Sequence, residues 1–292
     1  TYTEWTDNFD FDWFISEHFR LKARVSYSER TDKQEKFTDP ESAIYNESDY
    51  QDGEGILKRG EAYSFHEKSS NLDMNVVFSY NQQLGSHFLN AVLGGNVIET
   101  RFENESYSVI GFPSGSMDYI SFGKEFKDLT PEGSEGLSRL VGLFVNLNYT
   151  WNNIYLLDLS GRLDGSSKFG SKKRYAPFWS AGIGWNMHYE SFLKDKEWLK
   201  QLKLRASMGY TGSQNFNPYQ AMATYKYFTN AEYDNIVGAY LMGMANDKLK
   251  WQRTRDINMG LDAQLLKGLT LRFDYYISNT DNLLVDFDLS GS

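Results

Sequence analysis

A strict alternation of apolar and polar residues, repeated along most of the chain, constrains its fold more than any other feature. In WSAGIGWN (residues 179–186), Trp, Ala, Ile and Trp alternate with Ser, Gly, Gly and Asn. Because successive side chains of a β-strand point to opposite faces, this period of two predicts a strand with one apolar face. Similar runs predict about ten strands, at residues 9–14, 19–27, 72–80, 88–98, 141–149, 155–163, 179–189, 204–210, 257–265 and 269–277. We therefore expect an all-β chain.

The connections between the predicted strands alternate in length. Short turns are expected near residues 15–18, 84–86, 151–153 and 267–268, and long polar connections over residues 31–59, 105–134, 164–174 and 213–248. The remaining link, ESFLKDKEWLKQ (residues 190–201), is expected to form a short amphipathic helix. Tight turns on one side and long loops on the other are typical of an outer-membrane β-barrel, whereas a soluble sandwich has no reason to sort its loops in this way.

The two faces of the predicted strands favour a membrane protein over a soluble one. The apolar face ends repeatedly in Tyr or Trp, at Tyr80, Tyr149, Trp151, Trp179, Trp185, Tyr189, Tyr210 and Trp251. Amphipathic rings at strand ends suit the boundary between lipid and water. The opposite face carries charges at regular positions, at Arg20, Lys22, Arg24, Arg162, Lys203, Arg205 and Arg272. Such charges are costly in a dry core but not beside water, so the pattern predicts a transmembrane antiparallel β-barrel with a wet lumen.

Composition narrows the possible functions further. The 292 residues include no cysteine, which excludes thiol catalysis, disulfides and cysteine-bound zinc. Their net charge of −9 disfavours nucleic acid as a partner, because contact with phosphates needs a basic surface. The sequence contains no apolar run long enough to predict a transmembrane helix. The start, TYTEWTDNFDFDWF, lacks the pattern of a signal peptide, so we expect a chain that is not exported, or a mature or internal segment.

Four stretches in the second half of the chain resemble the SusC/RagA-type TonB-dependent transporters of the Bacteroidota outer membrane. They are NNIYLLDLSGRLDGSSKFG (residues 152–170), RYAPFWSAGIGWNMHYESFLKD (174–195), LKLRASMGYTGSQNFNPYQ (202–220) and LKWQRTRDINMGLDAQLLKGLTLRFDYYISNTDNLL (249–284). The resemblance is specific over residues 150–284 and diffuse before them. APFWS departs slightly from the family's usual Phe-Pro-Ser, a difference to which we attach no functional weight.

The resemblance implies a barrel of about 22 strands in the bacterial outer membrane, filled by an N-terminal plug. It also implies import of oligosaccharides or peptides, energised by TonB, beneath a SusD-like surface lipoprotein, in a dimer of transporter–lid pairs. About ten strands are too few for such a barrel. Residues 1–292 are therefore expected to be one internal part of the barrel domain, without the plug, the TonB box or the remaining strands. Because an isolated piece would expose two unpaired edges, we expect neighbouring strands.

Two groups of residues are candidates for contact with substrate or with the lid protein. The basic stretch RLDGSSKFGSKKR contributes Arg162, Asp164, Lys168 and Arg174, and the long connection after residue 213 contributes Tyr219, Tyr225, Tyr227 and Tyr233. The first group could instead form a loop held by an Arg162–Asp164 pair, with glycines at its turns. We favour this structural role, because the family shares the motif while its substrates vary. The tyrosines suit stacking on sugars, the core of a folded loop or a lid interface.

Other chemistry finds little support. The histidines are scattered without metal-ligand spacing, at His18, His66, His87 and His188. The acidic stretch SDYQDGEG lacks the spacing of an EF-hand. We therefore expect no metal site there. We also expect no other cofactor and no enzyme activity. A small closed outer-membrane protease would need acidic residues beside a histidine, for which His66 with Glu61 and Glu67 is a weak nucleus. A soluble β-rich adhesin or carbohydrate-binding module fits the 16% aromatic content but not the sorted loops.

Overall fold

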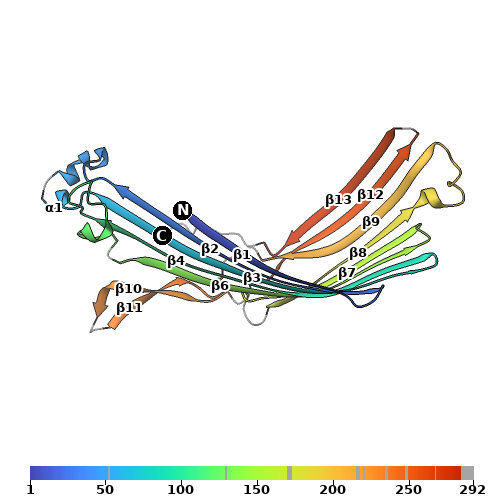
Figure 1. Cartoon of the computed structure of the whole chain (residues 1–292), viewed down its shortest axis with the longest axis horizontal. Coiled ribbons are helices and arrows are strands. Elements are labelled where there is room, and N and C mark those ends of the chain that lie inside the picture. The colour runs from blue at the N-terminus through green and yellow to red at the C-terminus, as the bar shows by residue number, and fades with distance from the viewer. Residues whose placement is uncertain are drawn as a thin grey trace.

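A computed structural model describes residues 1–51, 53–128, 130–169, 173–214, 218–219, 221–233, 236–246, 249–266 and 268–283, with only the backbone of 227–233, 236 and 237. Figure 1 shows one long, curved sheet and a separate hairpin of two strands. The sheet contains β1 (Tyr2–Phe14), β2 (Phe19–Thr38), β3 (Glu61–Leu84), β4 (His87–Ile110), β5 (Glu125–Phe126), β6 (Glu132–Trp151), β7 (Tyr155–Ser166), β8 (Tyr175–Asn186), β9 (Leu199–Ser213), β12 (Gln252–Leu265) and β13 (Leu269–Asp281). The hairpin contains β10 (Thr224–Tyr233) and β11 (Ile236–Gly243).

The strands of the main sheet lie side by side in the order in which they follow along the chain. The order is β1-β2-β3-β4-β6-β7-β8-β9-β12-β13, and the short β5 pairs with the end of β4. Every neighbouring pair is antiparallel. This meander confirms the prediction of an all-β antiparallel architecture with about ten long strands. Within the described residues β1 and β13 each pair on one side, so the sheet is open.

The register of the sheet carries the alternating pattern from strand to strand. Ala181 pairs with Met208, and Met208 pairs with Ile257. The row continues to Ile277 on β13. Such rows form one face of the sheet, which we call the outer face, and they remain exposed, as for Ile183 at 63%. A soluble protein would cover rows of this kind, so the outer face is suited to lipid.

The opposite face, which we call the lumen face, carries the small and charged residues that lie between the apolar ones. Gly182 pairs with Ser207, and Ser207 pairs with Asn258. All the charged residues predicted to face water share this face: Arg20, Lys22, Arg24, Arg162, Lys203, Arg205 and Arg272. The predicted division into an apolar and a polar face is therefore confirmed.

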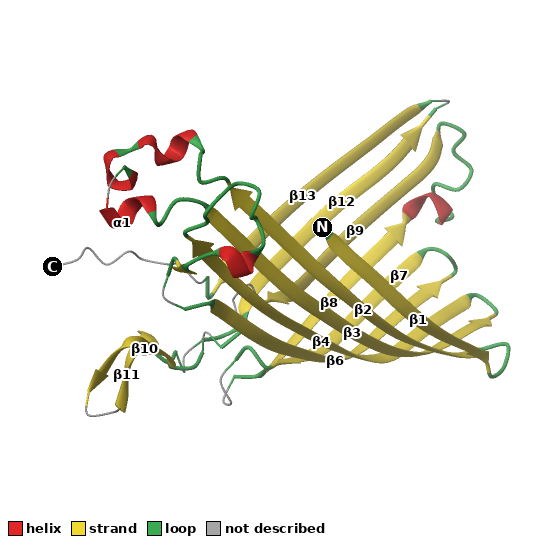
Figure 2. Ribbon diagram, turned by 60° about the vertical axis from the view of Figure 1, so that its left-hand side comes forward, coloured by secondary structure: helices red, strands yellow, loops and turns green. Residues whose placement is uncertain are grey.

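The two ends of the sheet differ in their connections, as predicted. Tight turns lie at one end, and the β6–β7 turn places Asn152 and Asn153 at φ 53° and 60°, a left-handed conformation that asparagine tolerates. The hairpin and most of the short helices lie at the opposite, loop end (Figure 2). The helices are η1 (Ala43–Asn46), η2 (Ser48–Tyr50), α1 (Gly53–Ile56), η3 (Ile120–Phe122) and, at the turn end, η4 (Met187–Tyr189). No helix among the described residues is long and apolar enough to cross a membrane.

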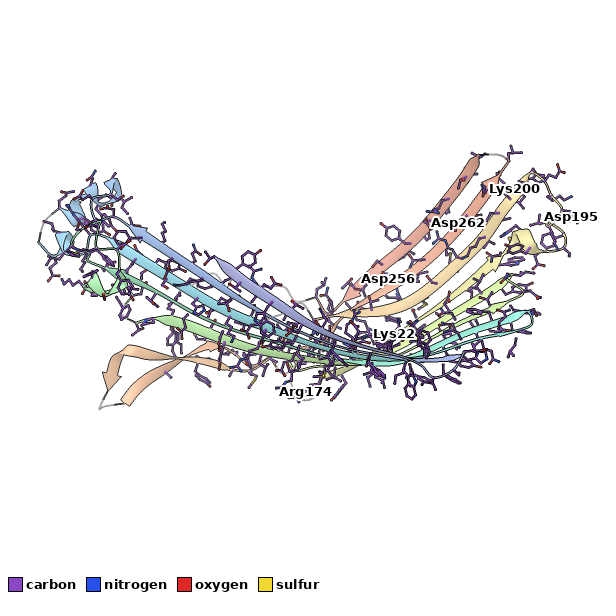
Figure 3. All side chains as sticks on the ribbon, viewed as in Figure 1. Lys22, Arg174, Asp195, Lys200, Asp256 and Asp262 are labelled. Carbon is purple, nitrogen blue, oxygen red and sulfur yellow. The ribbon has the colours of Figure 1, made fainter. Side chains whose placement is uncertain are left out.

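The predicted helix at residues 190–201 is wrong. The preceding strand ends at Asn186, earlier than predicted, and η4 follows it. A single turn then forms in which the Lys194 N–H donates to the Glu190 carbonyl at 2.8 Å. Because a lone turn is too short to be a stable helix, pairing of Leu199 with β12 begins the next strand instead. Asp195 and Lys200 of this link lie at the turn end in Figure 3.

The predicted loops are also shorter than expected. Strands β2, β3 and β4 run for 20, 24 and 24 residues, so parts of the predicted loops 31–59 and 105–134 are strand. These polar extensions still pair with neighbouring strands, on both sides for β3 and on the β3 side alone for the end of β2, and this pairing supplies the ladder hydrogen bonds of a strand in water. The predicted loop 213–248 contains the hairpin β10–β11.

A small apolar core packs the connections above β2, β3 and β4. Ala62, Val109 and Phe112 are buried there, and the Phe37 ring meets the Phe112 ring at 5.1 Å. Beside this core, Lys127 Nζ donates to Glu61 Oε2 at 2.9 Å. Burial acts to raise the pKa of the Glu61 carboxyl, but its hydrogen bonds outweigh burial and hold the pKa below its usual 4.5.

Candidate functional site

Ion pairs line the lumen face near the β13 edge of the sheet. The Asp262 carboxylate accepts hydrogen bonds from Arg205 Nε at 3.2 Å and from Arg272 Nε at 3.0 Å. Asp274 also pairs with Arg205. Figure 3 shows Asp256 and Asp262 following one another along β12. The charges on this part of the lumen face are therefore largely balanced by their neighbours.

The opposite edge of the lumen face has the same character. Arg24 Nε donates to Asp10 at 2.6 Å, and Arg20 pairs with Asp12. Lys22 lies between these pairs, opposite Asp12 in the register, and has no ion pair within the described residues. Exposed pairs of this kind contribute little to stability, so their main effect is to make the wall wettable.

Two large rings on the lumen face lie over glycines of the neighbouring strands. The Phe144 ring covers Gly94, and a Cβ atom at Gly94 would collide with it. The Phe178 ring covers Gly212 in the same manner. The glycines let each ring lie against the backbone of the next strand.

Arg162 and Asp164 form the most buried polar network of the wall. Arg162 Nε donates to both Asp164 carboxylate oxygens, at 2.6 and 2.7 Å, and Arg162 Nη2 donates to Asn96 Oδ1 at 2.9 Å. Asp164 is only 8% exposed. The network fills the space above Gly142, where any Cβ atom would collide with it. The guanidinium also lies 5.7 Å from the centre of the Phe144 ring. The geometry ties β4, β6 and β7 together.

Next to this network, an aromatic cluster packs at the loop end of β7 and β8. Phe169 stacks on Trp251 at 4.7 Å, and Phe178 meets Trp251 edge-on at 5.7 Å. Trp251 Nε1 donates to the Arg174 carbonyl at 3.2 Å. We call this cluster the loop core; its buried members are Phe169, Phe178, Ala221, Leu249 and Trp251. It joins three segments that are distant in the sequence.

The position of Trp251 corrects the sequence prediction. Trp251 was predicted to belong to the aromatic boundary of the lipid-facing surface, but its ring is 8% exposed and lies in the loop core. It precedes the first paired residue of β12, so the strand alternation does not determine its direction. Sequence reasoning also missed Phe169, although Phe169 is the one apolar side chain in SSKFGSKK.

The other residues of the first predicted group contribute mainly through their backbone. The Lys168 N–H donates to Ser166 Oγ at 3.2 Å, and the Ser166 N–H donates to the Arg174 carbonyl at 3.1 Å. The Lys168 side chain is half-buried and the Arg174 side chain is exposed. Figure 3 places Arg174 at the underside of the sheet, near the start of β8. The structure thus unites Arg162 with Asp164 and leaves the Arg174 side chain exposed.

The predicted tyrosines lie in or beside the hairpin segment. The Tyr219 hydroxyl accepts a hydrogen bond from the Leu137 N–H at 3.3 Å, which ties this segment to β6. Tyr225 on β10 is 66% exposed. The side chains of Tyr227 and Tyr233 lie outside the described residues, so the predicted cluster is described only in part.

The residues considered as a weak nucleus for a protease site do not come together. Glu61 is engaged by Lys127, and His66 and Glu67 are adjacent on β3 and so point to opposite faces. His87 contacts the Tyr149 hydroxyl at 2.7 Å at the turn end of the sheet. In the part of the chain that the structure describes, no three His, Asp or Glu side chains are grouped to hold a metal ion.

Comparison with known proteins gives relatives along the whole chain. Residues 1–292 match the family described as "TonB dependent receptor-like, beta-barrel". TonB-dependent receptor P3 of Formosa agariphila is 32% identical over 227 residues, covering 77% of this chain and 23% of that protein. TonB-dependent receptor SusC of Bacteroides thetaiotaomicron is 33% identical over 224 residues, covering 73% of this chain and 21% of that protein. The chain thus spans less than a quarter of these relatives.

Solved structures share the fold. The RagAB peptide importer in its closed-closed state matches 99% of this chain and 31% of its own, with a TM-score of 0.86 at 23% identity. The ferric-catecholate receptor Fiu of Escherichia coli K12 matches 96% of this chain and 41% of its own, with a TM-score of 0.54 at 12% identity. The relatives carry the names of receptors and importers, not of enzymes. The chain belongs to the TonB dependent receptor-like β-barrel family and is an outer-membrane protein of the SusC/RagA type.

Proposed function

We propose that this sheet is part of the wall and outer loops of a nutrient importer that is energised through TonB and performs no catalysis itself. The observation that carries the proposal is the division of the sheet into two faces. Exposed apolar rows cover the outer face, while ion pairs and small polar residues line the lumen face. A wall of this kind separates lipid from a wet passage.

Further strands would complete the barrel. The two edge strands carry exposed rings on their outer faces. These rings are Phe9 and Phe11 on β1 and Phe273 and Tyr275 on β13. Unpaired edges flanked by such rings suit additional strands of a longer chain, up to a barrel of about 22. In this proposal the plug and the segment that contacts TonB also belong to that longer chain.

A SusD-like surface lipoprotein is the proposed partner at the loop end, with transporter–lid pairs joined in a dimer. The hairpin β10–β11 and its surroundings present Tyr225, Met242 and Met244 to solvent. Adaptable apolar side chains such as methionine suit a contact that opens and closes. We assign Arg162 and Asp164 to the support of the wall, and Lys168, Arg174 and the four predicted tyrosines to contact with substrate or lid.

The proposed substrates are oligosaccharides or peptides, and uptake by intact cells distinguishes them. Cells that carry or lack the full-length gene would be given labelled oligosaccharides or labelled peptides, with and without an uncoupler of the proton gradient. We expect uptake of one class to require both the gene and the gradient. Uptake of both classes that is unchanged without the gene would contradict the proposal.

A further inference from the structure

A second cluster of aromatic and basic residues lies on the outer face, where β8, β9 and β12 approach the loop end. Trp179 pairs with Tyr210, and Tyr210 pairs with Arg255. The two rings lie 5.6 Å apart. The guanidinium of Arg253 sits over the Tyr210 ring at 4.1 Å. We call these four residues the rim cluster. It stands directly above the apolar row of the outer face that begins at Ala181.

The two arginines of the rim cluster have no ion pair among the described residues, although Asp281 lies opposite Arg253 in the register of β12 and β13. Elsewhere on the outer face, Arg139 pairs with Glu99 at 2.6 Å, and Lys68 pairs with Glu29 at 3.1 Å. Neither Arg253 nor Arg255 has a carboxylate within ion-pair distance among the described residues. Arg253 Nε is buried and has no hydrogen-bond partner among the described residues. Arg255 is exposed and Arg253 is only partly buried, so their guanidinium groups together suit an anion supplied from outside.

An apolar furrow lies on the same face toward the turn end, separated from the rim cluster by the apolar row of Ala181, Met208 and Ile257. Ala206 is small and lies between Ile183 on β8 and Met259 on β12, with which it pairs on either side. Larger side chains such as Phe273 border the furrow, whose volume is about 790 Å³. The furrow lies among side chains that face lipid, so it has the shape and polarity to hold a hydrocarbon chain.

We propose that the rim cluster and the furrow together bind a phosphorylated glycolipid of the outer leaflet. The cluster lies toward the long connections, which face the outside of the cell in outer-membrane barrels. The guanidinium groups of Arg253 and Arg255 would bind the phosphate, since the planar fork of arginine matches phosphate oxygens. Trp179 and Tyr210 would lie against the sugar, and an acyl chain would occupy the furrow over Ala206.

Lipid retained by the full-length protein tests this assignment. The protein would be purified from outer membranes in mild detergent, and the bound glycolipid would be counted by native mass spectrometry. We expect the double variant Arg253→Gln/Arg255→Gln to retain about tenfold less glycolipid. The matched control is Lys68→Gln/Arg139→Gln, which removes two positive charges from the same face and should retain the lipid.

Two further variants separate a lipid site from an adventitious anion site. Ala206→Phe fills the furrow and should lower retention while leaving both arginines in place. Arg253→Lys/Arg255→Lys keeps the charge without the fork and should retain an intermediate amount. Equal retention in all variants, an equal loss in the control, or displacement by inorganic phosphate with no effect of Ala206→Phe would each overturn the proposal. Heat-modified electrophoretic mobility verifies that each variant is folded.

Discussion

The spanning part of the sheet and the loop core are both rich in aromatic and small residues, yet they are held together differently. In the sheet, each row repeats the same contact across many strands, and the rings of the outer face remain exposed. In the loop core, Phe169 and Trp251 are buried by residues distant in the sequence. The sheet depends on its solvent, lipid on one side and water on the other, whereas the loop core supplies its own apolar surroundings.

The loop core should show the largest response to truncation. We expect Trp251→Ala to cost about 3–5 kcal/mol of local stability, because it removes a buried ring and leaves a cavity. Hydrogen exchange of the backbone near Phe169 would measure the loss. Tyr225→Ala, which truncates an exposed ring, should change exchange there by less than about 0.5 kcal/mol. Equal effects of the two variants would mean that the loop core does not stabilise the loops.

A charge placed on the sheet should have an effect that depends on the face. We expect Ile183→Arg to cost about 2–4 kcal/mol, because it places a cation against lipid in the apolar part of the wall. Ser207→Arg, on the lumen face of the neighbouring strand, should cost about 1 kcal/mol or less. Folding of the full-length protein into lipid bilayers, titrated with urea, measures both. Similar costs for the two variants would contradict the assignment of the faces.

A change in the polar network of Arg162 and Asp164 should have an intermediate effect on stability. We expect Asp164→Asn to cost about 1.5–3 kcal/mol, since it removes charge-assisted bonds from Arg162 at a buried position. The same urea titration measures the change. Arg174→Gln, at an exposed side chain, is the control and should stay within about 0.5 kcal/mol. A cost for Arg174→Gln as large as that for Asp164→Asn would show that the loop depends on both side chains.

The smallest effect on stability should come from protonating Glu61, which pairs with Lys127 at the loop end. The pKa of Glu61 is lowered in the folded protein, so the pair contributes stability above pH 4.5 that is lost as the pH falls toward the lowered pKa. Because Lys127 is half exposed, we expect this contribution to be below about 1 kcal/mol. Hydrogen exchange near Ala62 at pH 6 and pH 3.5, compared with Glu61→Gln, measures it. If the change in hydrogen exchange between the two pH values persisted in Glu61→Gln, other titratable groups would be its cause.

The alternating pattern predicted the sheet well but the loop end poorly. The faces of residues such as Arg205 and Ile257 follow from sequence alone, because a one-residue shift in register would exchange lipid and water for the whole strand. No such rule governs Trp251, which lies just before its strand, or the turn after Tyr189. The polar extensions of β3 and β4 were missed for a related reason: above the membrane both faces meet water, so the pattern weakens while the hydrogen-bond ladder continues.

The sequence by itself determined the class of the protein, the two faces of the sheet and the sorting of its connections, since period two and turn residues act over a few neighbours. The tertiary structure decided which separate segments meet. Arg162 and Asp164 were foreseen as a pair because they are two residues apart in the sequence, but Asn96, which accepts a hydrogen bond from Arg162, lies 66 residues from Arg162. The burial of Phe169 against Trp251 and the position of Arg255 opposite Tyr210 likewise depend on strand order and register, which bring distant residues together through long-range pairing.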